Sequence, residues 1–211
     1  MKTLVLCDDF WHPARVPREG VAALGECGFT FDFLENANDW SAEKMQGYPL
    51  VIFTKSNNIT ATDPRPWVSE QVEQAFVDYV RTGNGLLVIH SGAAGYESTP
   101  TLRKLMGGIF THHPPQCQVT VTPVAGAASA LIAGVTPFVI TDEHYHMAFE
   151  DPQANVYVHT TSEHGRQPGG WTRLEGAGRV CMLTPGHNVE VWQAPGFQKL
   201  LTNGMRWCTK Q

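Results

Sequence analysis

The chain has 211 residues, of which 42% are hydrophobic and 17% are charged, and its formal net charge is -5 at pH 7. This length suits one α/β domain with a sizeable core, and the composition excludes a disordered chain. The 15 lysines and arginines are spread along the sequence without a basic run, so we expect no nucleic-acid partner.

The first half of the sequence alternates between predicted strands and predicted helices. We predict strands over residues 3–7, 29–34, 50–53 and 85–89, and helices over residues 17–27, 41–46 and 66–81. In the last of these helices, apolar residues recur at three- and four-residue spacing, and Gly83 follows its end. The predicted strand over residues 85–89 is apolar throughout, as central strands of parallel sheets are. This order predicts a parallel sheet with right-handed crossovers.

The second half contains shorter predicted strands and one long predicted helix. We predict strands over residues 118–122, 138–140, 156–158 and 179–183, and a helix over residues 195–208. Prolines and glycines crowd the segment from Pro100 to Gly186, which predicts mainly loops there. With neither a repeat nor a linker, we expect one domain, residues 1–211, of the α/β class, with an open, mostly parallel sheet flanked by helices. The short strands also allow a homo-oligomer formed along a sheet edge.

Cysteine usage and the N-terminal residues indicate the compartment. The five cysteines are an odd number without a C-x-x-C pair, and they are Cys7, Cys27, Cys117, Cys181 and Cys208. We interpret them as buried free thiols in a reducing compartment. The apolar run at the N-terminus is too short for a signal peptide, and no stretch reaches membrane-spanning length. We therefore expect a cytoplasmic protein without a membrane partner.

Most of the nine histidines lie where a predicted strand ends and the chain turns. These histidines are His12, His90, His112, His113, His144, His146 and His187. Open α/β sheets bind ligands beyond the carboxyl ends of their strands. Imidazole is both a common metal ligand and a proton-transfer group near neutral pH. The pattern predicts a polar site for a small molecule.

The turn after the strand 85–89 carries His90, Ser91 and Gly92. Related folds carry a nucleophile at such a strand-to-helix turn. The chain has no G-x-S-x-G motif and no cysteine near this position, so an acyl nucleophile is not expected. We predict that His90 lines the site and that Ser91 binds substrate, with a core histidine held by the backbone as the alternative for His90.

The densest polar cluster is Asp142-Glu143-His144-Tyr145-His146. Alternation along an extended segment places Glu143 and Tyr145 on one face and the other three residues on the opposite face. Glu143 is our candidate general acid or base, and Tyr145 is a candidate substrate contact. The same carboxylate and histidines also suit a divalent metal, and a solvated strand end is the structural alternative.

Four further residues are candidate substrate contacts, although each also has a structural interpretation. Asp9 and His12 follow the first predicted strand, where they would otherwise solvate the strand end. His113 precedes two prolines that stiffen its loop, and His187 follows a glycine that permits a tight turn. Trp11 has the flat face that stacks on sugars, but tryptophans in a domain of this size are mostly core residues.

Several motifs together resemble one known family, the trehalose-utilisation (ThuA-like) family. They run from the first strand to the last helix and include Gly85-Leu-Leu-Val-Ile-His-Ser, Gly107-Gly-Ile-Phe-Thr-His-His-Pro, Asp142-Glu-His-Tyr and Gly186-His. The resemblance implies a class I glutamine amidotransferase-like (flavodoxin-like) three-layer fold that lacks the amidotransferase nucleophile. It also implies a role in sugar metabolism, with keto-sugars derived from disaccharides such as trehalose as substrates. Where the family often has Asp-Glu-Leu-Tyr, this chain has His144, which favours a metal or a divergent substrate.

Three functions follow from these patterns. The first is acid–base, non-nucleophilic conversion of a small sugar or keto-sugar, by isomerase or lyase chemistry, with Glu143, His90 and His187 as catalytic residues. The second is a metal-dependent sugar enzyme, with zinc as the expected ion and with candidate ligands His12, His90, His144 and His187 beside Glu143. The third is a sugar-binding or regulatory module without catalysis.

Overall fold

The computed structural model describes residues 1–127 and 130–211 and contains a nine-stranded sheet with the order β2-β1-β3-β4-β11-β10-β9-β6-β7. Its strands are β1 Lys2–Leu6, β2 Thr30–Leu34, β3 Leu50–Phe53, β4 Gly85–Ile89, β6 Cys117–Pro123, β7 Phe138–Asp142, β9 Asn155–Ser162, β10 Gly165–Glu175 and β11 Gly178–Leu183. The strands from β2 to β11 pair in parallel, and those from β11 to β7 pair antiparallel. Strands β5 Gly108–His112 and β8 His146–Phe149 form a separate antiparallel pair.

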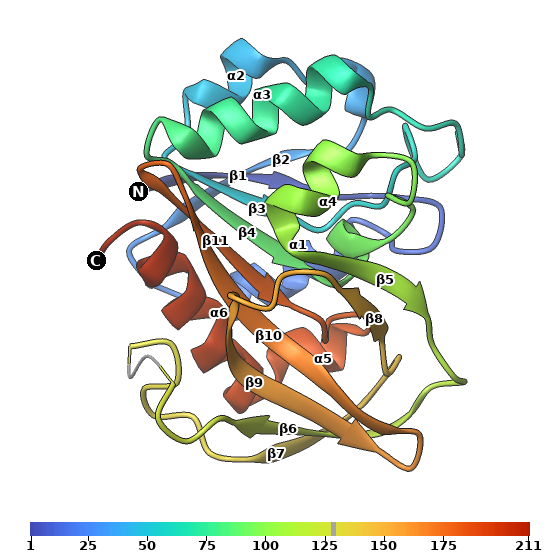
Figure 1. Ribbon diagram of the computed structural model, residues 1–211, viewed down its shortest axis with the longest axis vertical. Helices are drawn as coiled ribbons and strands as arrows, with labels where there is room; N and C mark the ends of the chain where they lie inside the picture. The colour runs from blue at the N-terminus through green and yellow to red at the C-terminus, as the bar shows by residue number, and fades with distance from the viewer. Residues whose placement is uncertain (128–129) are drawn as a thin grey trace.

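Helices cover both faces of the parallel strands, which gives the predicted three layers (Figure 1). The helices are α1 Arg15–Ala22, α2 Ala42–Gln46, α3 Glu70–Arg81, α4 Pro100–Met106, α5 Val189–Gln193 and α6 Pro195–Cys208. Alternating side chains of β1 divide between two cores, since Val5 packs with residues of α1, α5 and α6, and Leu4 packs with residues of α2, α3 and α4. The strands β3 and β4 alternate in the same way, so each is apolar along its whole length.

The predicted elements of the first half are confirmed, with shifts at their ends. Strands β3 and β4 and helix α6 have the predicted bounds. The helix predicted over 66–81 begins at Glu70, because the Ser69 side chain accepts a hydrogen bond from the backbone N–H of Val72 and so caps the helix.

The loops predicted between residues 100 and 186 are partly wrong, because that segment contains α4, β5, β8 and β10. Strand β10 includes Pro168 and three glycines, which disfavour a strand in isolation. The structure accommodates them with register shifts between Pro168 and Gly170 and between Gly170 and Trp171, opposite β9. The pairing with β9 and β11 therefore overrides the local composition.

The cap of α3 gives a direct test of the fold. Replacing Ser69 with Ala leaves a backbone N–H of the first turn without its side-chain acceptor, and we expect a loss of about 1 kcal/mol in the free energy of unfolding. Urea denaturation followed by circular dichroism measures this loss. The exposed Ser98 is the matched control, and an equal loss in Ser69→Ala and Ser98→Ala would contradict the capping role.

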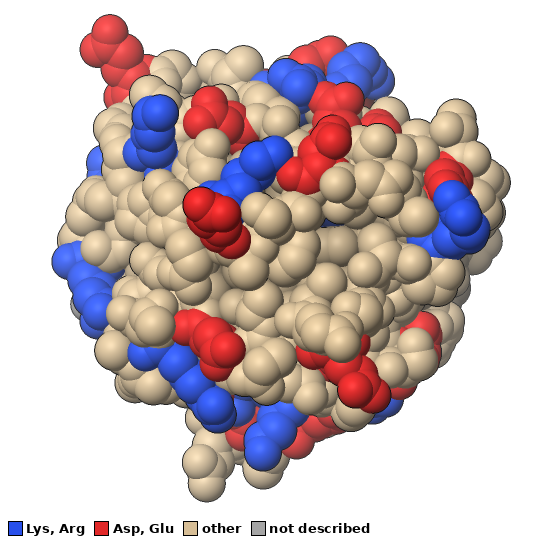
Figure 2. Space-filling model, turned by 90° about the horizontal axis from the view of Figure 1, so that it is seen from above, with Lys and Arg blue, Asp and Glu red and all other residues tan. Residues whose placement is uncertain are grey.

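The cysteines and the surface agree in part with the sequence interpretation. In the described chain all five cysteines are free thiols, but only Cys7, Cys181 and Cys208 are buried, and Cys27 and Cys117 are half-buried. Acidic and basic side chains are interspersed over the face seen in Figure 2. Within residues 1–127 and 130–211, no helix has the length and apolar character needed to cross a bilayer.

Candidate functional site

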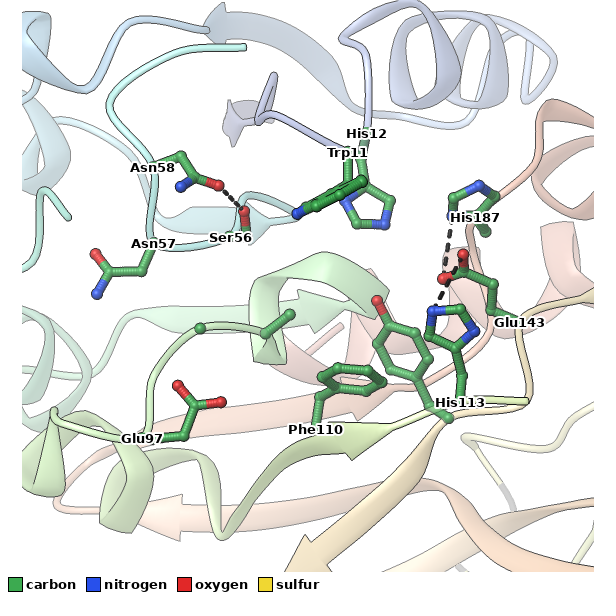
Figure 3. Close-up of a pocket in the computed structure, with 13 residues that line it drawn as sticks. Trp11, His12, Ser56, Asn57, Asn58, Glu97, Phe110, His113, Glu143 and His187 are labelled. Atoms are coloured by element: carbon green, nitrogen blue, oxygen red, sulfur yellow. Dashed lines mark hydrogen bonds and ion pairs between the residues drawn. The ribbon is translucent and has the colours of Figure 1, made fainter. Parts of the chain in front are cut away.

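A cavity of about 410 Å³ lies where several strands of the sheet end. Its lining comes from the segments that follow β1, β3, β4, β7 and β11 and from β5 and the residue after it. This is the edge where open α/β sheets bind ligands, and the volume lies in the range of small-molecule sites. Figure 3 shows Glu143 between His187 and His113, with Asn57, Asn58 and Glu97 on the far side of the cavity.

His90 occupies the turn that follows β4, and its backbone is strained there. Its φ is 45°, in the left-handed region that residues other than glycine rarely adopt. The His90 Nδ1–H donates to the backbone carbonyl of Thr184 at 2.8 Å, because a carbonyl oxygen can only accept. The His90 Nε2 is buried and has no hydrogen-bond partner in the described chain. Burial lowers the pKa of His90 to about 4, so the ring is neutral at pH 7.

His12 is held by the buried carboxylate of Asp9. Asp9 Oδ1 lies 2.8 Å from His12 Nδ1, and the Asp9 carboxylate also accepts backbone N–H bonds from Trp11 and Ser56. Burial alone would raise the pKa of Asp9, but these hydrogen bonds outweigh it and lower the pKa. Because ionised Asp9 can only accept, His12 carries its proton on Nδ1. The His12 Nε2 is buried and without a hydrogen-bond partner among the described residues.

Glu143 faces three imidazole rings. Glu143 Oε2 lies 3.3 Å from His90 Nε2 and 3.2 Å from His187 Nδ1, and Oε1 lies 3.5 Å from His113 Nε2. Burial opposes ionisation of Glu143, but its contacts with His187 and His90 outweigh burial and hold the pKa of Glu143 below its usual range. In turn, the Glu143 side chain raises the pKa of His187. Glu143 is therefore a carboxylate at neutral pH, which fits a base or a ligand better than a general acid.

His187 is positioned through its backbone by Asp142, the last residue of β7. The Asp142 carboxylate accepts the N–H of Gly186 at 2.8 Å and that of His187 at 3.1 Å. Burial raises the pKa of Asp142 to about 7, although these N–H bonds favour its charged form. Gly186 adopts a φ of 145°, which only glycine takes readily. The turn after β11 is thus fixed against β7, beside Glu143.

Four predicted site residues converge closely enough to share one ligand. The side-chain donor atoms of His12, His90, Glu143 and His187 all lie within 4.8 Å of one another. They come from the segments after β1, β4, β7 and β11, which are far apart in the sequence. His113 and Tyr145 lie beside this group, and the Tyr145 ring stacks on His90 with ring centroids 3.9 Å apart.

The structure corrects three predicted placements. His144 is not with the other candidate ligands, because its side chain faces Ser162 at 2.7 Å and Thr160 at 3.2 Å from the opposite face of the segment. Ser91 is fully buried with its Oγ 3.4 Å from Thr54 Oγ1, and it is not among the residues that line the cavity. Asp9 is buried behind His12 and positions that ring instead of lining the cavity.

Several cavity residues were not predicted. Asn57 and Asn58 follow β3, and Glu97 and Phe110 also line the cavity. Polar residues at the end of β3 are the one signal in the sequence that indicated the two asparagines. Of the two interpretations of Trp11, a core residue or a surface for stacking on a sugar, the core one is wrong, because Trp11 is 69% exposed and lines the cavity.

Comparisons with known proteins identify related sequences and folds. The sequence profile described as trehalose utilisation (ThuA) matches residues 3–208. No protein with a curated function matches significantly in sequence. A ThuA-like protein from Parabacteroides merdae has a TM-score of 0.77 at 18% identity, covering 99% of this chain and 90% of that one. A cytoplasmic protein from Salmonella typhimurium has a TM-score of 0.72 at 15% identity, covering 100% and 98%.

Part of a larger enzyme has the same fold. A β-galactosidase from Rahnella sp. R3 has a TM-score of 0.66 at 17% identity, covering 97% of this chain but 31% of the enzyme. At these identities the likeness concerns the fold alone. The predicted class I glutamine amidotransferase-like architecture is thereby confirmed.

Proposed function

The chain belongs to the ThuA family of trehalose utilisation, and from that premise we propose that it is an enzyme that converts a small sugar or keto-sugar derived from a disaccharide such as trehalose. Family membership links the chain to carbohydrate metabolism. The observation that carries the finer proposal is the convergence of Glu143 with the rings of His90, His113 and His187 at the cavity. Grouped imidazoles and a carboxylate are suited to moving protons near neutral pH.

The turn after β4 argues against covalent catalysis. His90 occupies the position where a nucleophile elbow would present cysteine or serine, and Ser91 is fully buried beside Thr54. This supports non-nucleophilic chemistry next to a carbonyl group. A base removes the proton from the carbon beside the carbonyl, and the electron pair moves onto the carbonyl oxygen. When the hydroxyl on the deprotonated carbon passes its proton to this oxygen and the abstracted proton returns to the former carbonyl carbon, the isomerisation is complete without a co-reactant.

We assign the proton transfer to His113 and Glu143. The His113 Nδ1–H donates to the Pro114 carbonyl at 2.8 Å, so Nε2 is the nitrogen that exchanges a proton. This Nε2 faces Glu143 Oε1, and 35% of the His113 side-chain surface is exposed. The ionised Glu143 stabilises the protonated ring after it has taken the substrate proton.

The cavity walls support a sugar ligand. Trp11 and Phe110 offer aromatic faces to the apolar side of a sugar ring. Asn58 and Glu97 offer amide and carboxylate groups to its hydroxyls. This combination of flat apolar surface and a few polar groups is typical of small-molecule sites.

The assignment of His113 is tested by hydrogen exchange at the substrate. In D₂O, the protein is expected to introduce deuterium at the carbon beside the carbonyl of a keto-disaccharide, and NMR detects this. His113→Ala is expected to lower the exchange rate by about 10²-fold or more. His112→Ala is the matched control, because the adjacent His112 ring is exposed and stacks on His146, with centroids 4.5 Å apart.

Two results would reject the proposal. Equal exchange rates in the two variants would remove His113 from the chemistry. Saturable sugar binding without exchange or product, across a panel of keto-sugars, would instead identify a sugar-binding module.

A further inference from the structure

We infer that the cluster of His12, His90, His187 and Glu143 is a binding site for a divalent transition-metal ion. The inference deepens the proposed function, because the ion would act in the same cavity, and its catalytic role rests on that function. Binding of the ion can be measured without any substrate.

The hydrogen bonds of two histidines fix which nitrogen is free to bind. His12 donates its Nδ1–H to Asp9, and His90 donates its Nδ1–H to the Thr184 carbonyl. In the neutral ring the other nitrogen, Nε2, then carries a lone pair. Both Nε2 atoms are buried, and neither has a hydrogen-bond partner in the part of the chain that the structure describes. Burial of an unpaired polar atom is costly, so these two atoms point to a ligand.

The position of Glu143 makes a cation the fitting ligand. Glu143 Oε2 lies 3.3 Å from His90 Nε2, so a carboxylate oxygen and an imidazole lone pair face each other. His90 is only 1% exposed, and burial disfavours a charged ring. A metal ion between the two atoms turns both lone pairs into ligands. His187 Nδ1, 3.2 Å from the same oxygen and also without a hydrogen-bond partner among the described residues, faces the cluster from a third side.

The distances agree with a first-row metal. Four ligands at about 2.0 Å from a tetrahedral ion lie about 3.3 Å apart, and the two pairs that include Glu143 Oε2 are at 3.3 and 3.2 Å. The widest separation is within 4.8 Å, so modest side-chain rotation closes the remaining pairs. Three imidazole nitrogens and one carboxylate oxygen favour zinc, nickel, cobalt or iron over magnesium or calcium.

The surroundings of the ligands resemble those of metal sites. Metal-binding histidines usually donate their second N–H to a carboxylate or a backbone carbonyl, which orients the ring. Asp9 accepts this N–H from His12, and the Thr184 carbonyl accepts it from His90. Asp142 fixes the backbone of His187. In the cavity, the ion would polarise a carbonyl oxygen of the sugar, while Glu143 Oε1 remains beside His113.

The experiment is a metal titration of tag-free protein that has first been stripped with a chelator. Isothermal titration with Zn²⁺, and the visible spectrum after addition of Co²⁺, are expected to show one ion per chain. His187→Ala removes a ligand whose side chain is partly exposed, so the variant is expected to fold. It should bind at least about 100-fold more weakly, whereas His112→Ala should bind like the wild type.

Each outcome bears on one of the two proposals. If the wild type fails to bind Zn²⁺, Co²⁺, Ni²⁺ or Fe²⁺ stoichiometrically, or if His187→Ala binds as tightly as His112→Ala, the metal site is rejected. If stripped protein still exchanges substrate hydrogen at the full rate, the proposed function stands without the metal. If the ion binds but no keto-sugar undergoes exchange, the metal site stands and the proposed function fails.

Discussion

Glu143→Gln is expected to reduce turnover by about 10³-fold and yet, at pH 8, to leave the metal-free protein as stable as the wild type or more stable. The loss of activity follows because glutamine can neither accept a proton nor supply the negative charge that stabilises a protonated His113. The same change is expected to weaken metal binding, since an amide oxygen is a poorer ligand than a carboxylate.

The gain in stability has a separate cause. In the wild type without metal, Glu143 Oε2 faces the His90 Nε2 lone pair at 3.3 Å. The amide N–H of glutamine can donate to this nitrogen, and such a hydrogen bond contributes about 1 kcal/mol.

The pH dependence of this difference has a defined sign. Glu143 raises the pKa of His187 above its ordinary value, so their attraction stabilises the wild type at low pH, where His187 is protonated. That contribution is lost as the pH rises through the pKa of His187 in the folded protein. The stability advantage of Glu143→Gln is therefore expected to grow from pH 6 to pH 8.

Urea denaturation of chelator-treated proteins at pH 6 and pH 8 measures these stabilities. Addition of Zn²⁺ should make the wild type more stable than Glu143→Gln. An ion that binds the folded wild type and is present at 100 times its Kd adds about 2.7 kcal/mol to the free energy of unfolding. His112→Ala is again the control. A metal-free Glu143→Gln protein that is less stable than the wild type at pH 8 would show that Glu143 serves the fold more than the site.

The sequence predicted the site best where local geometry decides the outcome. Alternation along residues 142–146 placed Glu143 and Tyr145 on one face and His144 on the other. The structure follows that rule, because Glu143 and Tyr145 line the cavity and His144 faces Ser162 on the opposite side. The metal interpretation includes His144 because histidine is a common ligand, although the alternation places this residue on the face opposite Glu143. The rule that ligands bind at strand ends correctly brought His12, His90 and His187 together.

The sequence predicted less where tertiary contacts decide the outcome. Strand β10 contains Pro168, Gly169 and Gly170, and its path depends on pairing with β9 and β11. The direction of the Ser91 side chain depends on Thr54 at the end of the neighbouring β3. Neither contact is encoded in a local pattern.

Gly92→Ala is expected to lower the free energy of unfolding by about 3 kcal/mol or more, or to prevent folding. A Cβ at Gly92 would lie 2.0 Å from the Phe53 carbonyl oxygen and 2.9 Å from Val88 Cγ1. The nearest atom belongs to the backbone of β3, which is paired with β4 and cannot move away cheaply. The turn that carries His90 therefore requires glycine two residues later.

The test compares urea denaturation of Gly92→Ala with that of Gly47→Ala. At Gly47 the nearest atom to a new Cβ is 3.3 Å away and the backbone has an ordinary φ of -71°, so alanine should change stability by less than about 1 kcal/mol. Adding Val88→Ala to Gly92→Ala should not restore stability, because the clash with the Phe53 carbonyl remains. Rescue by Val88→Ala would place the conflict in a side chain, and wild-type stability of Gly92→Ala would mean that the turn can hold His90 in another backbone conformation.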